Sequence, residues 1–127
     1  MRTVALIARI LMGAIFLVFG LNGFFHFIPT PPPTGLAGEF NHALFASGYA
    51  YLVFGVQAIA GFLLLANQFV PLALLLLGPV IVNIIVFHLS MQLSGLPPGL
   101  VVMVLWLILA YRCRALFLPF LRNTSAD

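Results

Sequence analysis

The sequence predicts an all-α membrane protein, a polytopic bundle of four spanning helices that uses residues 1–127 as one domain. Hydrophobic residues make up 64% of the chain and charged residues only 6%, and the mean hydropathy is +1.23. This composition excludes a soluble enzyme and a disordered tail. Four spans need about 80 apolar residues, so little of the chain is left for a soluble domain.

The first span is expected over residues 4–28, an apolar run broken only by Arg9, Asn22 and His26. The run is long for a secretory signal and has no obvious cleavage site of small residues, so we expect a spanning helix rather than a cleaved leader. A proline-rich segment follows at 29–35. Because proline fixes φ and lacks an N–H donor, this segment predicts a stiff, extended outer loop.

A short interfacial helix is expected next, over residues 36–48. Its polar residues Glu39 and His42 share one face. The opposite, mainly apolar face carries Leu36, Phe40, Ala43, Leu44 and Ser47.

The remaining spans are expected over residues 49–66, 71–89 and 98–115. Pro71 and Pro98 suit the first turn of a helix, where a missing N–H costs nothing. The Gly78–Pro79 pair falls inside the third span. A proline in a helix interior removes a hydrogen bond, so a kink is predicted there.

Arginine placement sets the expected orientation. Arg2 and Arg9 flank the first span, Arg112, Arg114 and Arg122 follow the last, and the outer loops contain no Lys or Arg. The positive-inside rule then places both termini in the cytoplasm, as in a multi-pass protein of a bacterial inner membrane. Arg9, Arg112 and Arg114 are expected to anchor the bundle to lipid phosphates. The net charge of +3 comes from these arginines and predicts no nucleic-acid surface.

The polar residues of the spans gather in the outer half of this topology. They are Asn22, His26, Gln57, Asn83 and His88, with Glu39 and His42 in the outer loop. One interpretation is that the amides form interhelical hydrogen bonds while the histidines lie at the interface. The other is a small outer pocket, lined by the three histidines and Glu39 with the amides below, that binds a polar headgroup, a quinone ring or a metal ion.

Cofactor signals in the sequence are weak. Three imidazoles and a carboxylate are enough ligands for zinc, but HxxxH and CxxC spacings are absent. His26 and His88, at similar depth on different helices, could ligate a haem or a chlorophyll. Gly20 and Gly23 would admit the macrocycle edge, although small residues also let two helices approach closely.

Most catalytic chemistry has no candidate residues here. Cys113 is the sole cysteine, which excludes disulfide exchange within the chain, although the flanking arginines favour its thiolate. The spans contain neither Asp nor Glu, so a carboxylate proton relay is not expected. We therefore predict no catalytic activity for the chain on its own.

The sequence resembles DoxX-like membrane proteins over nearly its whole length. The resemblance rests on RILMGAIFLVFGLNGFFHFIP (9–29) in the first span and on FVPLAL (69–74) through PVIVNIIVFHL (79–89) in the third. It implies a small four-helix bacterial inner-membrane protein, and some members of the wider family are described as subunits of quinone-linked oxidoreductase complexes. The chain departs from the family pattern at Asn22-Gly23-Phe-Phe-His26, where a lysine often follows the second glycine, and no catalytic residue is carried over.

Two functions follow from these observations. The first is an accessory or structural subunit beside a larger membrane complex, redox or photosynthetic, with lipids and other membrane-protein subunits as partners. The alternative is a quinone-linked redox protein or a small-ligand-binding protein whose polar pocket lies on the outer side.

Overall fold

The computed structural model describes residues 1–123, and within this range the chain forms helices and no strand. Asp127, the second acidic residue of the sequence, lies outside the described residues. Four helical segments are long and apolar enough to cross a membrane, which confirms the predicted all-α, four-span fold. These segments contain the helices α1 (Arg2–Phe25), α3 (Tyr49–Ala66), α4 (Val70–Met91) and α5 (Leu96–Arg112). The short 3-10 helix η1 (Leu93–Gly95) precedes α5 in the fourth segment.

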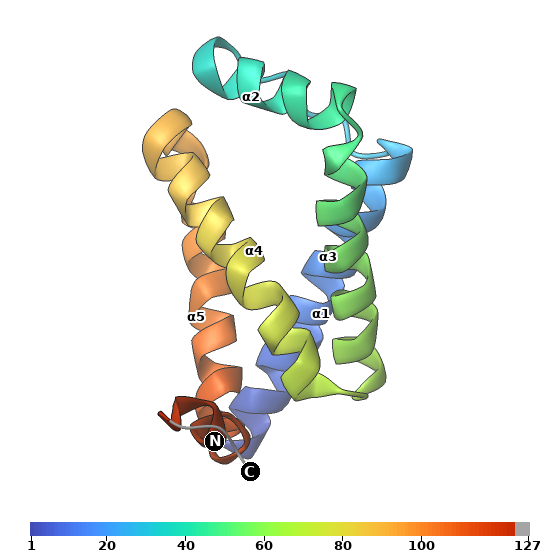
Figure 1. The fold of residues 1–127 in the computed structure, drawn as a ribbon. Helices are drawn as coiled ribbons and strands as arrows, with labels where there is room; N and C mark the ends of the chain where they lie inside the picture. The colour runs from blue at the N-terminus through green and yellow to red at the C-terminus, as the bar shows by residue number, and fades with distance from the viewer. Residues whose placement is uncertain (124–127) are drawn as a thin grey trace.

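The four long helices close into a ring in which α1 packs on α3 and α5, and α4 packs on the same two helices. The start of α1 and the end of α5 lie at one end of the bundle, called here the terminal end. Toward the other end, the α1–α3 pair and the α4–α5 pair diverge (Figure 1). There α2 (Gly35–Ala46) lies across the bundle and packs on α3 and α4.

The closest helix contact joins α1 to α3 and depends on glycine. A Cβ atom on Gly20 would lie 2.5 Å from the backbone nitrogen of Ala58, and one on Gly61 would lie 2.4 Å from that of Leu17. At Gly23 the side chain of Phe54, rather than helix backbone, occupies the adjacent space. The small residues of α1 therefore serve close helix packing, since α3 occupies the space beside them.

The well-packed core lies in the terminal half of the bundle. Met12, Leu64, Leu74 and Leu77 are the largest side chains that are completely buried. Met12 comes from α1, Leu64 from the last turn of α3, and the two leucines from the first half of α4. The converging ends of the helices are thus held by apolar packing, which leaves the diverging ends to enclose a different environment.

The first span ends at Phe25 rather than at Ile28, because Asn22 terminates it. The Asn22 side-chain oxygen accepts a hydrogen bond of 2.8 Å from the backbone N–H of Ile28. His26 adopts the left-handed conformation with φ of 52°, and its N–H bonds the Asn22 carbonyl. The side chain of Asn22 is therefore used in a helix cap.

Helix α4 continues through Pro79, and the predicted kink there stays a prediction. Near the proline, side chains donate to backbone carbonyls. The indole Nε1–H of Trp106 donates to the Leu74 carbonyl at 2.8 Å, and the Asn83 amide donates to the Pro79 carbonyl at 2.8 Å. Both donors are satisfied inside the bilayer region, where an unpaired N–H is costly.

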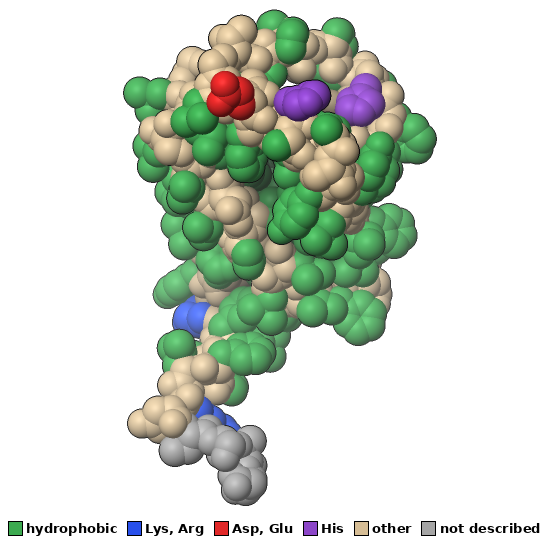
Figure 2. All heavy atoms as spheres, turned by 45° about the horizontal axis from the view of Figure 1, so that its top comes forward, with side chains coloured by type: hydrophobic (Ala, Val, Ile, Leu, Met, Phe, Trp, Pro, Cys, Tyr) green, Lys and Arg blue, Asp and Glu red, His purple; other side chains and the backbone are tan. Residues whose placement is uncertain are grey.

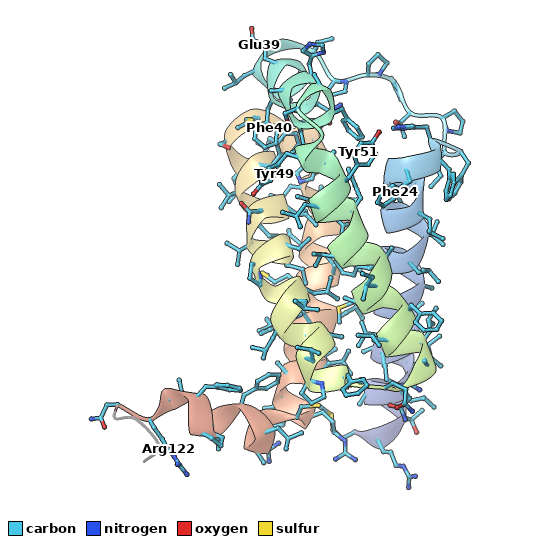
Figure 3. The ribbon with its side chains drawn as sticks, turned by 45° about the vertical axis from the view of Figure 1, so that its right-hand side comes forward. Phe24, Glu39, Phe40, Tyr49, Tyr51 and Arg122 are labelled. Atoms are coloured by element: carbon cyan, nitrogen blue, oxygen red, sulfur yellow. The ribbon has the colours of Figure 1, made fainter. Side chains whose placement is uncertain are left out.

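The last span ends at Arg112 rather than at residue 115, and the chain then turns sideways. The short helices α6 (Arg114–Phe117) and η2 (Leu118–Leu121) run across the bundle axis at the terminal end (Figure 3). Phe117 packs against the core, which holds this segment against the bundle.

Candidate functional site

A cavity of about 690 Å³ lies in the half of the bundle where the helices diverge. Each of the four spanning helices contributes to its wall, and α2 contributes Phe40, Asn41 and Leu44. Phe40 from α2 and Tyr49 from the first turn of α3 stand at the α2 end of the cavity (Figure 3). The cavity therefore lies between the four spans, beneath α2, and is partly open.

Most of the cavity wall is apolar, and much of it is aromatic. Phenylalanine rings come from α1, α2, α3 and α4, and they are Phe16, Phe19, Phe40, Phe54 and Phe87. The polar side chains of the wall are Asn41, Tyr49, Gln57, Asn83 and His88. Such a surface suits a mainly apolar molecule that carries a few polar groups.

Gln57 is the most deeply buried polar side chain of the cavity, with an exposed fraction of 6%. Within residues 1–123 its amide makes no side-chain hydrogen bond, and no fully occluded side-chain nitrogen or oxygen in this range lacks a partner. The amide of Gln57 therefore keeps accessible surface, and the cavity that it lines provides it. An unpaired amide in an apolar environment favours any ligand that supplies a hydrogen bond.

His88 presents one defined ring atom. Its Nδ1 lies 2.8 Å from the Ile84 carbonyl oxygen, and a carbonyl can only accept, so Nδ1 carries the proton. In the neutral ring Nε2 is then a hydrogen-bond acceptor. The ring is positioned by Gly95, because a Cβ atom there would lie 2.5 Å from the imidazole Cδ2 and 2.7 Å from Nε2.

Gln57 and His88 start from different heights along the bundle, and their side chains lean toward each other. Counted along the antiparallel helices from the α3–α4 turn, their backbones lie about 14 Å and about 27 Å from the terminal end. Helical side chains lean toward the N-terminus of their own helix. Gln57 therefore leans toward the α2 end, whereas His88 reaches back one turn to Ile84, so each side chain leans toward the level of the other.

Asn83 lies between these two groups on the α4 wall. Its Nδ2 donates to the Pro79 carbonyl one turn below, which leaves Oδ1 as an acceptor. Three of the seven residues predicted to bind a ligand, Gln57, Asn83 and His88, are thus brought to one cavity.

The other four predicted residues, Asn22, His26, Glu39 and His42, do not line this cavity. Asn22 caps α1, and the ring of His26 packs on Phe45 with 5.4 Å between centroids. Glu39 and His42 are exposed on α2. Figure 2 shows the acidic group and two imidazoles on the surface at the α2 end. Residues 1–123 contain no group of three His, Cys, Asp or Glu side chains that could hold a metal ion.

Asn41 and Tyr49 are cavity residues that the sequence reasoning missed. Asn41 lies three positions before Leu44, on the α2 face that turns toward the bundle. That spacing is a signal which could have separated it from Glu39 and His42. A tyrosine at the start of a span is typical of an interfacial aromatic residue, and nothing in the sequence distinguishes Tyr49 from Tyr51.

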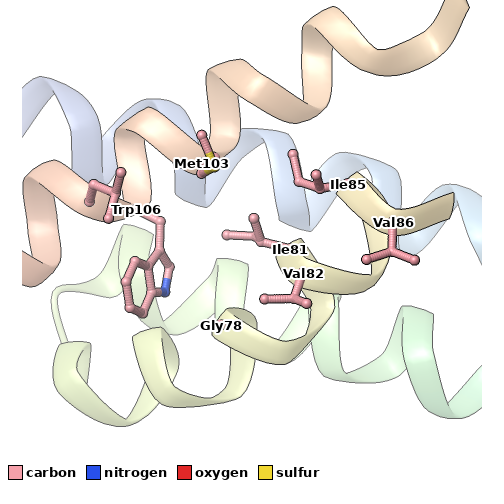
Figure 4. A pocket seen from close by; sticks show the side chains of 8 residues that line it. Gly78, Ile81, Val82, Ile85, Val86, Met103 and Trp106 are labelled. Carbon is pink, nitrogen blue, oxygen red and sulfur yellow. The ribbon is translucent and has the colours of Figure 1, made fainter. Parts of the chain in front are cut away.

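A second, smaller concavity of about 340 Å³ lies between α4 and α5. Its wall is formed by apolar side chains and Gly78, including Ile81, Met103 and Trp106 (Figure 4). The indole N–H of Trp106 is already bonded to Leu74. This groove therefore offers a ligand no free polar group.

The arginines at the terminal end differ in their contacts. Arg9 donates to the carbonyls of Leu64 and Leu65 at the end of α3. A cation at the C-terminus of a helix interacts favourably with the helix dipole. Arg114 donates to the Tyr111 carbonyl at 2.9 Å and lies 4.2 Å from the centre of that ring. Arg112 is exposed.

Burial decides the ionisation of Cys113. Removal of the thiol from water raises its pKa, and the opposing effect of the neighbouring Arg112 is smaller. From the sequence, the flanking arginines were expected to favour the thiolate of Cys113. In the structure burial outweighs them, so Cys113 is a neutral thiol at neutral pH.

The fold and the cavity define a class: a small polytopic α-helical membrane protein whose bundle surrounds an aromatic cavity with a buried glutamine on its α2 side. The family model of DoxX matches residues 4–89. The chain belongs to the DoxX family, as the sequence resemblance implied. No curated protein and no solved structure matches the chain. The matched range includes α1 to most of α4, and hence Gln57, Asn83 and His88.

Proposed function

We propose that the protein binds a small ring-bearing amphiphile of the quinone class in the cavity beneath α2. We also propose that α2 faces the outer side of a bacterial inner membrane and that both termini are cytoplasmic. The arginines at the terminal end support this orientation through the positive-inside rule. Arg112, which is exposed at that end, is then placed to contact lipid phosphates, with Arg9 and Arg114 near the same surface.

The observation that carries this proposal is the amide of Gln57. Gln57 as a residue is 6% exposed, its amide makes no side-chain hydrogen bond within residues 1–123, and it lines the cavity. A carbonyl or hydroxyl oxygen on a ligand would satisfy it. A hydrogen bond between the ligand and this amide would contribute about 1 kcal/mol to binding.

Size and surface chemistry also fit a ring with an apolar substituent. Ligand cavities usually have volumes of about 300–1,000 Å³, and this one has about 690 Å³. Aromatic walls favour a flat ring by stacking and edge contacts. Phe19 and Tyr49 are both lining residues and exposed on the bundle surface, so a ligand dissolved in lipid can reach the cavity from the bilayer.

Binding is tested with decylubiquinone and protein reconstituted in nanodiscs, by native mass spectrometry or equilibrium partition. The Gln57→Leu variant is expected to bind about fivefold more weakly, because one hydrogen bond is worth about 1 kcal/mol. Gln68→Leu is the matched control, since Gln68 is exposed in the α3–α4 turn at the terminal end. Equal binding by both variants and the unaltered protein, or no binding at all, would overturn the proposal.

A second candidate function is that of an accessory subunit of a larger redox or photosynthetic complex. The exposed surface of α5 favours it. The α5 span is the least covered of the four, and the apolar groove beside it contains Trp106 (Figure 4). A photo-crosslinker at Leu107, within the groove, should capture a membrane-protein subunit in native membranes. The same group at Ile59, exposed on α3, should not; adducts with lipid alone at both positions would remove this candidate.

A further inference from the structure

We infer that the cavity prefers the hydroxyl-bearing, reduced form of its ring ligand, because His88 offers that ligand an acceptor and not a donor. This inference rests on the proposed function and specifies the ligand of the same cavity. It names His88 as the residue that distinguishes a hydroquinone or phenol from the corresponding carbonyl compound.

The neutral ring of His88 is held in one tautomer. His88 Nδ1 lies 2.8 Å from the Ile84 carbonyl oxygen. Because this oxygen can only accept, Nδ1 must donate to it. The proton of the neutral ring is committed to this bond, so Nε2 has a lone pair only. A hydroxyl hydrogen pairs with it, whereas a carbonyl oxygen in the same place sets two acceptors against each other.

The position of the His88 ring is also fixed. Gly95 lies against the Cδ2–Nε2 edge so closely that any Cβ atom would displace it. The Phe87 ring lies edge-to-face with the imidazole at 5.1 Å between centroids. Rotation that would exchange the two nitrogens would also break the Ile84 bond, so Nε2 stays on the ring edge next to Gly95, which itself lines the cavity.

The other polar groups of the cavity do not discriminate between the hydroxyl-bearing and the carbonyl-bearing form of the ligand. Gln57 has both donor and acceptor atoms and can turn to satisfy either ligand form. The same holds for the hydroxyl of Tyr49 and the amide of Asn41. Asn83 adds a second acceptor, Oδ1, on the His88 side of the cavity. The preference therefore resides on the α4 wall.

The test uses a redox-inert pair of probes, 4-hexylphenol and its methyl ether 4-hexylanisole, with protein in nanodiscs at pH 8. The unaltered protein should bind the phenol about tenfold more tightly than the ether, beyond the difference in their partition into protein-free nanodiscs. His88→Phe keeps a flat ring without the acceptor and should bring the ratio close to one. Gly95→Ala, which displaces the imidazole, should lower the ratio in the same direction.

The matched control is His42→Phe, the same exchange at an exposed position on α2, which should retain the tenfold ratio. Equal binding of phenol and ether by the unaltered protein, with binding still weakened by Gln57→Leu, would overturn this inference and leave the proposed function standing. If neither probe binds, and decylubiquinone does not bind either, the proposed function fails as well. The comparison within the unaltered protein needs no variant to fold.

Discussion

Gly20→Ala should destabilise the bundle, because the added methyl group has no room between α1 and α3. Its Cβ would lie 2.5 Å from the Ala58 nitrogen, 2.8 Å from its Cα and 2.9 Å from the Phe54 carbonyl oxygen. Ordinary contacts begin at 3.4 Å, so the two backbones must move apart by almost 1 Å. The atoms in the way belong to helical backbone and cannot rotate aside.

The magnitude follows from two opposing terms. Overpacking of this kind costs about 1–3 kcal/mol, whereas replacing glycine by alanine inside a helix gains up to about 1 kcal/mol. Gly55→Ala isolates the second term, since a Cβ at Gly55 would lie at an ordinary 3.7 Å from Phe24. The two variants should therefore differ by about 1–3 kcal/mol in free energy of unfolding.

Unfolding is measured by circular dichroism during titration of detergent micelles with sodium dodecyl sulfate. Gly55→Ala should unfold at the same or a higher dodecyl sulfate fraction than the unaltered protein, and Gly20→Ala at a lower one. If Gly20→Ala is as stable as Gly55→Ala, the close approach of α1 and α3 is not a feature of the folded protein.

Three further predictions concern single side chains. Trp106→Phe removes the bond to the Leu74 carbonyl and should lower the free energy of unfolding by about 0.5–1.5 kcal/mol in the same titration, with no change expected if that bond is absent. Asn22→Ala removes the side-chain bond to Ile28 and should speed amide hydrogen exchange at Ile28, while exchange at the centre of α1 is unaltered. Because burial raises the pKa of Cys113, its thiolate forms at higher pH than in the unfolded chain. Iodoacetamide should therefore alkylate it more slowly at pH 8 than in protein unfolded in dodecyl sulfate, and equal rates would contradict the burial.

The sequence predicts the spans well because hydropathy and proline placement reflect the bilayer and the backbone directly. The first and last spans nevertheless end earlier than expected. Asn22 accepts a local backbone hydrogen bond at the end of α1, and Cys113 caps α5 before the chain turns aside. Such choices depend on a few hydrogen bonds, which a residue pattern does not encode.

Part of the candidate site was also within reach of the sequence. Gln57, Asn83 and His88 were selected by depth, and depth follows from counting along helices. Rotation about each helix axis does not follow from counting. The packing of α2 on α3 and α4 turns Asn41 toward the cavity and Glu39 outward, and His26 is diverted onto Phe45 by the left-handed end of α1.

The separation of the packed core from the cavity has a consequence for local unfolding. The largest of the fully buried side chains join the helices in the terminal half, so helix ends at the α2 side can open without disrupting them. Amide protection should therefore form a gradient along each span, highest near Leu64 and Leu74. A ligand bound beneath α2 would add its free energy to the less protected end, and the gradient would become shallower as the cavity fills.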